Sequence, residues 1–240
     1  MKVPHHLAVI MDGNHRWAVQ RHLTGYQGHL EGQKTAFKLI EWCLKKGIPT
    51  LTLFVLSQDN LKRRARLEIK ALFEILSHAI QTQLNDLIEH QISLRILGDV
   101  SVFPESLAKA LLAAESETAE FDRMQLNLAL NYSGHWHVAE CVRHFVSKQF
   151  NDKSSSTWPS NEAIESWMQS SIQAPDLLIR TGQEQRLSNF MLWHCAYTEL
   201  FFSEVLWPDF KESHLDQAFE VFNARQRRFG GREMYADSSS

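Results

Sequence analysis

The sequence predicts one α/β domain with a mainly parallel central sheet and helices on both faces. Short apolar runs alternate along the chain with longer segments whose apolar residues recur at helical spacing. Several short runs end on polar clusters, as strands do when their carboxyl ends form a binding edge. A chain of 240 residues suits one sizeable α/β domain or two small ones, and nothing in the composition divides it.

The first element is a strand that ends in a polar turn. Residues 9–11 form a short apolar run, and Asp12-Gly13-Asn14 follows as the exit turn. A helix that begins near Asn14 would direct its free N–H groups toward the region that Arg16 reaches, which suits an anion. Asp12 would then lie where a divalent cation could link it to that anion. An alternative is that Asp12 only caps the helix.

Two helices and a strand are expected next. Residues 30–46 repeat apolar side chains at helical spacing and close with two lysines and Gly47. Residues 51–56 are too short for a lone helix and rich in β-formers, so we interpret them as a buried strand. The polar cluster 57–60 follows that strand. Residues 66–90 carry the longest helical pattern, with apolar residues over more than one stripe.

The strand-then-helix order continues through the middle of the chain. Residues 92–97 predict a third strand and 104–117 an Ala/Leu-rich helix. Residues 125–130 predict a fourth strand, with 131–134 as its exit loop and a helix over 137–148. The serine-rich segment 151–160 predicts a surface loop within the same domain.

The last third repeats the pattern less clearly. We expect a short helix over 163–169 and a fifth strand over 176–179, whereas residues 192–202 suit either helix or strand. Ser213 and Asp216 have the spacing of a capping box, which predicts a final helix to about residue 225. The predicted domain spans residues 1–232, and residues 233–240 are expected to form a disordered tail.

Composition excludes some classes of function. With 25 Lys plus Arg against 28 Asp plus Glu, the chain has no electrostatic footprint for nucleic acid or acidic lipid. There is no apolar stretch of about 18 residues and no charged-then-apolar leader, so we expect a cytoplasmic protein. The three cysteines have no paired spacing and lie among apolar neighbours, which indicates reduced core residues.

The carboxyl ends of the predicted strands bring together the residues of a cationic site. Its members are Asp12, Asn14, Arg16, Ser57, Asn60, Arg63, Arg180, Arg186 and Ser188. Arginines with backbone N–H groups and a hydroxyl suit phosphate oxygens, and a carboxylate beside them suits Mg²⁺. No nucleotide-binding glycine motif is present, so a diphosphate without a nucleotide fits better. His135 and His137 lack a third metal ligand at a recognisable spacing, and we interpret them as ordinary loop histidines.

Ordered motifs over nearly the whole chain resemble the cis-prenyltransferases, the undecaprenyl diphosphate synthase family. They are HLAVIMDGNHRWA at 6–18, Gly28-His29, residues 57–60 with Arg63, LRILGD at 94–99, Asn131-Tyr132, DLLIRTG at 176–182, RLSNFMLW at 186–193, residues 197–201, LWPDF at 206–210 and RRFGG at 227–231. The resemblance implies a single-domain homodimer that adds isopentenyl diphosphate to an allylic prenyl diphosphate with cis geometry, using Mg²⁺. It implies membrane contact only through the lipid product.

The resemblance also assigns roles to residues. Asp12 would be the metal-linked carboxylate, Glu199 a metal ligand for the second substrate, and Asn60 a catalytic residue that we interpret as a hydrogen-bonding positioner. The allylic diphosphate would be bound by Gly13, Asn14, Arg16 and His29, and isopentenyl diphosphate by Arg180, Arg186 and Ser188. Further substrate contacts are expected from His15, Trp17, Ser57, Gln58, Asp59, Arg63 and Leu187. Arg228 and Gly230 match a C-terminal motif that reaches toward the partner subunit's site.

The growing hydrocarbon chain is expected to occupy an apolar tunnel. Moving each five-carbon unit out of water is favourable by about 3 to 4 kcal/mol, at about 0.8 kcal/mol per CH₂. Residues 66–90 could form the wall of this tunnel or simply belong to the core; both readings stay open.

Several substrate-contact positions depart from the family pattern. Gly25 replaces an arginine, for which Arg64 or His15 could substitute, or it could be a glycine with a left-handed backbone. Other departures are His15, Asp59, Leu61, Arg64 (in place of a proline), Gln183, Gln185, His135 and His137. The leading hypothesis is an active enzyme with an unusual primer or product length. The alternative is a non-catalytic member of the fold that binds isoprenoid diphosphates or pairs with an active subunit.

Overall fold

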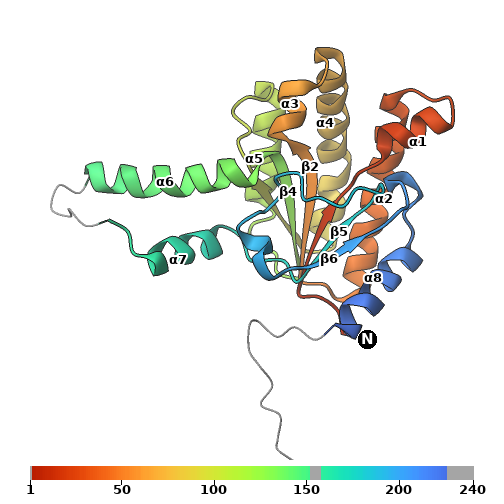
Figure 1. Ribbon diagram of the computed structural model, residues 1–240. Helices are drawn as coiled ribbons and strands as arrows, with labels where there is room; N and C mark the ends of the chain where they lie inside the picture. Colours follow the sequence, from red (N-terminus) through yellow and green to blue (C-terminus); the bar gives the residue numbers. More distant parts are fainter. Residues whose placement is uncertain (1, 152–157, 226–240) are drawn as a thin grey trace, which may run out of the picture.

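The chain folds around a six-stranded sheet in which every neighbouring pair of strands is parallel (Figure 1). The computed structural model describes residues 2–151 and 158–225. The strands are β1 His6–Ile10, β2 Thr50–Ser57, β3 Ile92–Leu97, β4 Met124–Tyr132, β5 Leu177–Arg180 and β6 Glu199–Phe202, in the order β3-β4-β2-β1-β5-β6. The predicted α/β class with a mainly parallel sheet is confirmed.

Helices connect the strands. They are α1 Asn14–Gln20, α2 Gly25–Lys46, α3 Gln58–Arg63, α4 Arg66–Glu89, α5 Glu105–Glu117, α6 Gly134–Asn151, α7 Asn161–Ser171 and α8 Glu212–Ala224, with short 3-10 helices η1 His194–Tyr197 and η2 Trp207–Asp209. In the part of the chain that is described, no helix combines the length and apolar character needed to cross a membrane.

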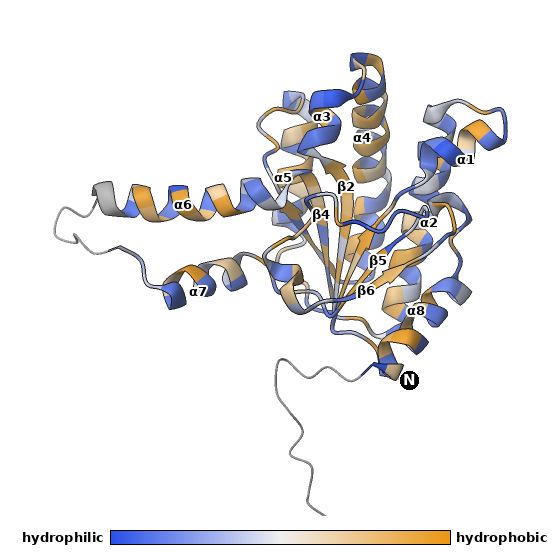
Figure 2. Cartoon of the chain, in the orientation of Figure 1, coloured by the Kyte–Doolittle hydropathy of each residue, from blue (hydrophilic) through white to orange (hydrophobic). Residues whose placement is uncertain are grey.

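The sheet separates two apolar clusters because successive side chains of a strand point to opposite faces. Leu7 and Val9 of β1 belong to the larger cluster, which includes residues of α2, α4, α5 and α8. Ala8 and Ile10 belong to the smaller cluster on the other face, with Phe190 and Met191. By contrast α6 and α7 extend away from the sheet (Figure 1), and α6 carries apolar turns despite that position (Figure 2).

Two helices begin where local capping was not recognised in the sequence. α2 begins at Gly25, five residues before the predicted start, because Thr24 and Gln27 form a capping box. The polar cluster after β2 continues into helix α3, where the Ser57 hydroxyl accepts the Asn60 N–H at 3.0 Å.

Other boundaries also correct the predictions. Asn131 and Tyr132 belong to β4 and not to a loop, and α6 begins at Gly134, so His135 and His137 are helical. The ambiguous segment 192–202 contains both η1 and β6.

The final helix, α8, begins at Glu212, before Ser213, and the Lys211 N–H donates to His214 Nδ1 at 3.0 Å. The predicted cap at Ser213 is therefore wrong. Most of the predicted 151–160 loop and the whole tail 226–240, including Arg228 and Gly230, lie outside the described residues.

Candidate active site

Asp12 and Arg180 meet at the carboxyl edge of the sheet because β1 and β5 are adjacent. Arg180 Nη2 donates to Asp12 Oδ2 at 2.9 Å, and Arg16 Nη2 lies 3.1 Å from Asp12 Oδ1. The Arg180 side chain is only 4% exposed, whereas that of Asp12 is 29% exposed. The Asp12 carboxylate thus binds two guanidinium groups, and it is the more exposed partner of its pair with Arg180.

The backbone around Asp12 fixes that carboxylate. Its carbonyl accepts the Trp207 N–H at 3.0 Å and the Thr181 hydroxyl at 2.7 Å. The N-cap of α1 is Gly13, at φ 118°, and no side chain caps the helix. The alternative that Asp12 is a helix cap is therefore wrong. A Cβ on Gly13 would approach Leu206 to 3.0 Å, so both space and backbone conformation require glycine.

A strained loop after β5 supplies the next polar groups. Arg180 Nη1 donates to the Ser188 hydroxyl at 2.9 Å and to the Arg186 carbonyl oxygen. Four loop residues that are not glycine, Gln183, Ser188, Asn189 and Met191, have φ between 45° and 71°. Left-handed conformations of this kind are costly and cluster at functional sites.

The opposite side of the site comes from α2 and the α3–α4 connection. Arg64 Nη1 lies 3.3 Å from His29 Nε2 and 2.9 Å from Glu68 Oε1. Burial, followed by the charges of Arg64 and His15, lowers the pKa of His29 to about 4. His29 is therefore neutral at physiological pH and can accept a hydrogen bond from Arg64.

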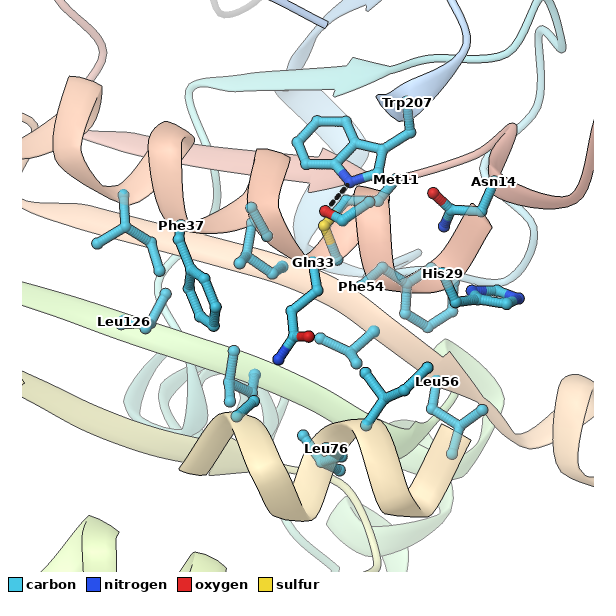
Figure 3. A pocket seen from close by; sticks show the side chains of 18 of the residues that line it. Met11, Asn14, His29, Gln33, Phe37, Phe54, Leu56, Leu76, Leu126 and Trp207 are labelled. Atoms are coloured by element: carbon cyan, nitrogen blue, oxygen red, sulfur yellow. Dashed lines mark hydrogen bonds between the residues drawn. The ribbon is translucent and has the colours of Figure 1, made fainter. Parts of the chain in front are cut away.

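These groups surround the mouth of a cavity of about 560 Å³ that continues between α2, α4 and the sheet. The inner walls are mainly apolar and include Phe37, Leu56, Leu76 and Leu126 (Figure 3). Leu72, Leu76 and Ile80 of α4 line the cavity and also belong to the core cluster. Residues of α4 therefore belong to the core and line the cavity at the same time, and that this cavity holds the growing chain stays a prediction.

The structure brings most of the predicted site residues to this cavity. Those that line it are Asp12, Asn14, His29, Ser57, Asn60, Arg180, Arg186 and Ser188, with Gly13 and Arg16 adjoining Asp12. Predicted contacts that do not line it are His15, Trp17, Gln58, Asp59, Arg63 and Leu187. The Trp17 indole instead donates to Asp209 Oδ1 at 2.8 Å, and Arg63 is exposed to solvent.

Glu199 is not brought to Asp12. It is the first residue of β6, pairs with Leu177 at the amino end of β5, and lies 2.6 Å from Arg225 Nη1. Arg180, at the other end of β5, contacts Asp12. The two predicted metal ligands therefore occupy opposite ends of the sheet within one chain, because β6 begins at Glu199.

The donor set at the mouth nevertheless fits Mg²⁺ bound together with a diphosphate. Residues 2–151 and 158–225 contain no group of three or more His, Cys, Asp or Glu side chains that could hold a metal alone. Mg²⁺ commonly uses one or two carboxylates and takes its other ligands from substrate phosphates and water. The partly exposed Asp12 carboxylate beside Arg16 and Arg180 can serve such a bound pair.

Arg64 and Gln33 line the cavity and are not among the predicted site residues. The sequence marks Arg64 as a departure from the family pattern and as a possible substitute for an arginine at position 25, but its place at the cavity depends on the path between α3 and α4. Gln33 points from α2 into the cavity (Figure 3), on the same helix face as Phe37 and Ile40. That helical spacing was the only signal for Gln33 in the sequence.

Gly25 is not a backbone requirement. It is the first residue of α2, and its φ lies outside the left-handed region. A Cβ at this position would lie 3.1 Å from His15 Cδ2. His15 therefore occupies the space in front of Gly25.

His137 belongs to a buried hydrogen-bonded cluster and not to a metal pair. Its Nδ1 lies 3.0 Å from the Tyr132 hydroxyl and its Nε2 lies 2.8 Å from the Ser171 hydroxyl. Because Ser171 donates to the Met168 carbonyl, Nε2 of His137 must be the donor, and Nδ1 accepts from Tyr132. The histidine is thus held in its neutral form.

Comparisons with known proteins agree with this geometry. Residues 10–230 match the family model described as "Putative undecaprenyl diphosphate synthase". A ditrans,polycis-undecaprenyl-diphosphate synthase from Haemophilus ducreyi is 41% identical over 96% of both chains. An isoprenyl transferase from Bacillus subtilis is 40% identical over 96% of this chain and 88% of the relative. Lavandulyl diphosphate synthase from Lavandula x intermedia, in complex with dimethylallyl diphosphate, has a TM-score of 0.88 at 33% identity, covering 95% of this chain and 98% of the other.

Proposed function

The chain belongs to the undecaprenyl diphosphate synthase family of prenyltransferases, and on that premise we propose that it joins isopentenyl diphosphate to an allylic prenyl diphosphate in an Mg²⁺-dependent reaction. It is an enzyme that condenses isoprenyl units with cis geometry. The new part of the proposal concerns the metal, the two substrates and the residues that bind them.

One observation carries the proposal: a cationic mouth opens directly into an apolar channel within a single cavity. Prenyl diphosphates have the same division between a multiply charged head and a hydrocarbon tail. Arginine pairs well with phosphate oxygens, and burial of the tail contributes about 0.8 kcal/mol per CH₂.

The reaction begins when the bond between the allylic C1 and its oxygen breaks and the electron pair remains on the diphosphate. Arg16 and Arg180 stabilise that negative charge, and Asp12 would hold the Mg²⁺. When bound, Mg²⁺ supplies further charge neutralisation at the leaving oxygens. The terminal double-bond carbon of isopentenyl diphosphate then bonds to C1, and a proton leaves its C2.

Isopentenyl diphosphate binds on the side of the mouth formed by Arg186 and Ser188. Asn60, in the first turn of α3, lines the same cavity. A carboxamide is too weak a base to take the proton, so Asn60 orients the substrate by hydrogen bonding and a diphosphate oxygen accepts the proton. The left-handed backbone of the loop keeps Ser188 beside Arg180.

An exposed apolar face on α6 supports a homodimer. Val138, Val142 and Val146 recur at four-residue spacing on α6 and are 40%, 57% and 38% exposed. Leu192 and Trp193, near the start of the same helix, are also exposed. A second copy of the chain would cover this surface. We expect a dimer in sedimentation measurements and a monomer for Val142→Glu; a wild-type monomer would contradict the dimer.

Incubation with radiolabelled isopentenyl diphosphate and primers of five, ten, fifteen and twenty carbons tests the function. The five-carbon primer is included because a structural relative was crystallised with dimethylallyl diphosphate. Label should enter longer prenyl diphosphates with Mg²⁺ and not with EDTA. Primer binding without incorporation would favour the alternative, a non-catalytic binding subunit.

A further inference from the structure

The arginines at the mouth differ in how many of their N–H donors are already bonded to other groups of the protein. Within the described ranges, three arginines line the cavity: Arg64, Arg180 and Arg186. Arg180 is buried and bonded to Asp12, to Ser188 and to the backbone. Arg186 is 61% exposed and pairs with Glu184. Arg64 lies between these extremes, because its side chain is half-buried at the cavity wall.

The donors of Arg64 are only partly used. Both of its contacts, with His29 and Glu68, involve Nη1. Among residues 2–151 and 158–225, Nε and Nη2 have no recorded protein partner. A guanidinium group can offer a planar pair of N–H donors to two phosphate oxygens, and here such a pair remains at the mouth.

The position of Arg64 indicates which of the two substrates it contacts. Arg64 lies between α3 and α4, two residues before α4 begins, and its partner His29 lies on α2 one turn before Gln33. These two helices form the facing walls of the apolar channel. A diphosphate bound at the contact between them would therefore direct its hydrocarbon tail along the channel. Arg186 and Ser188 reach the mouth from the loop after β5 instead.

We propose that Arg64 binds the diphosphate of the substrate whose prenyl tail occupies the channel, through the Nε and Nη2 donors that its contacts with His29 and Glu68 leave unused. This assignment rests on the proposed function, since it presumes a prenyl diphosphate in this cavity. His29, whose neutral imidazole accepts a hydrogen bond from Arg64, orients the guanidinium toward the bound head group. Arg64 is then a specificity residue for the allylic substrate.

Calorimetric titration of the full chain with farnesyl diphosphate, in the absence of isopentenyl diphosphate, tests the proposal without turnover. Arg64→Ala should raise the Kd at least tenfold, the expected loss for a charge-assisted contact. Arg64→Lys should recover part of the loss, because it restores the charge without the fork. Lys62→Ala, which removes an exposed cation two residues earlier, is the matched control and should stay within twofold of wild type.

Glu68→Gln separates binding from a structural role of the ion pair. The substitution breaks the same pair but leaves Arg64 in place. Tighter binding by Glu68→Gln supports the proposal, whereas weaker binding by both Arg64→Ala and Glu68→Gln means that the pair only orders the α3–α4 connection. Unchanged binding by a folded Arg64→Ala also overturns the proposal. If wild type itself does not bind farnesyl diphosphate, the proposed function fails instead.

Discussion

Replacing Asp12 by asparagine removes the charge that balances two arginines while it keeps the shape of the side chain. The carboxylate lies 2.9 Å from Arg180 and 3.1 Å from Arg16. We expect Mg²⁺-dependent turnover to fall about 10²- to 10³-fold, the usual cost of losing one preorganised electrostatic contact. Because Asp12 is 29% exposed, stability should fall by only about 1 to 2 kcal/mol, or about 2 to 8 °C in Tm.

Without Mg²⁺ the same substitution should strengthen the binding of inorganic diphosphate. It frees two guanidinium groups and removes a negative charge from the mouth. Two unit charges about 5 Å apart interact by about 3 kcal/mol at an effective dielectric constant of about 20. Partial exposure reduces this to about 1 kcal/mol, which is about a fivefold decrease in Kd.

Titration of inorganic diphosphate into both proteins, with and without Mg²⁺, measures this reversal. Mg²⁺ should tighten binding to wild type and have little effect on Asp12→Asn. Asp209→Asn is the matched control, because Asp209 also pairs with an arginine, Arg21 at 2.9 Å, but does not line the cavity. Equal tightening by Mg²⁺ in wild type and Asp12→Asn would refute the metal-linked role of Asp12.

Three further outcomes are expected. Arg186→Ala should raise the KM for isopentenyl diphosphate at least tenfold and that for the allylic primer much less; an equal rise would remove Arg186 from a single subsite. Gln183→Gly should raise Tm by about 2 to 4 °C, because Gln183 has φ 71°; a lower Tm would contradict the inferred strain. Burial lowers the pKa of His6 and His137 to about 4 and also lowers that of His194, from 6.5. Protonation therefore favours the unfolded chain, and stability should be complete above about pH 6.5 and fall toward pH 4, by up to about 1.4 kcal/mol per pH unit for each histidine. A Tm that is constant over this pH range would show that these histidines do not become charged on unfolding.

The sheet was predictable because buried parallel strands are short apolar runs, and β3 matches its predicted bounds of 92–97. Helix starts were less predictable because they depend on single side chains. α2 begins early because Thr24 and Gln27 form a capping box, a pattern that lies ahead of the first apolar residue at helical spacing. The strand β4 extends through Tyr132, whose ring is buried in the smaller cluster, so tertiary burial overrode the polar sequence around it.

The site was predictable where it depends on strand ends. Asp12 and Arg180 follow neighbouring parallel strands, so their meeting follows from the fold class. Arg64 depends on the path of a connection between helices, and the sequence alone does not give that path. Glu199 was expected at the site from a motif match, but such a match does not reveal which end of a strand a residue occupies.

The central claim is that the channel between α2 and α4 holds the growing prenyl chain, and product length measures it most directly. Leu76 of α4 is buried and lines the channel, whereas Leu67 on the same helix is 82% exposed. Products formed from labelled isopentenyl diphosphate should be shorter with Leu76→Trp, whose fold is checked by its Tm since overpacking costs about 1 to 3 kcal/mol. Leu67→Trp should give wild-type products. Unchanged product length from a folded Leu76→Trp protein would contradict the account.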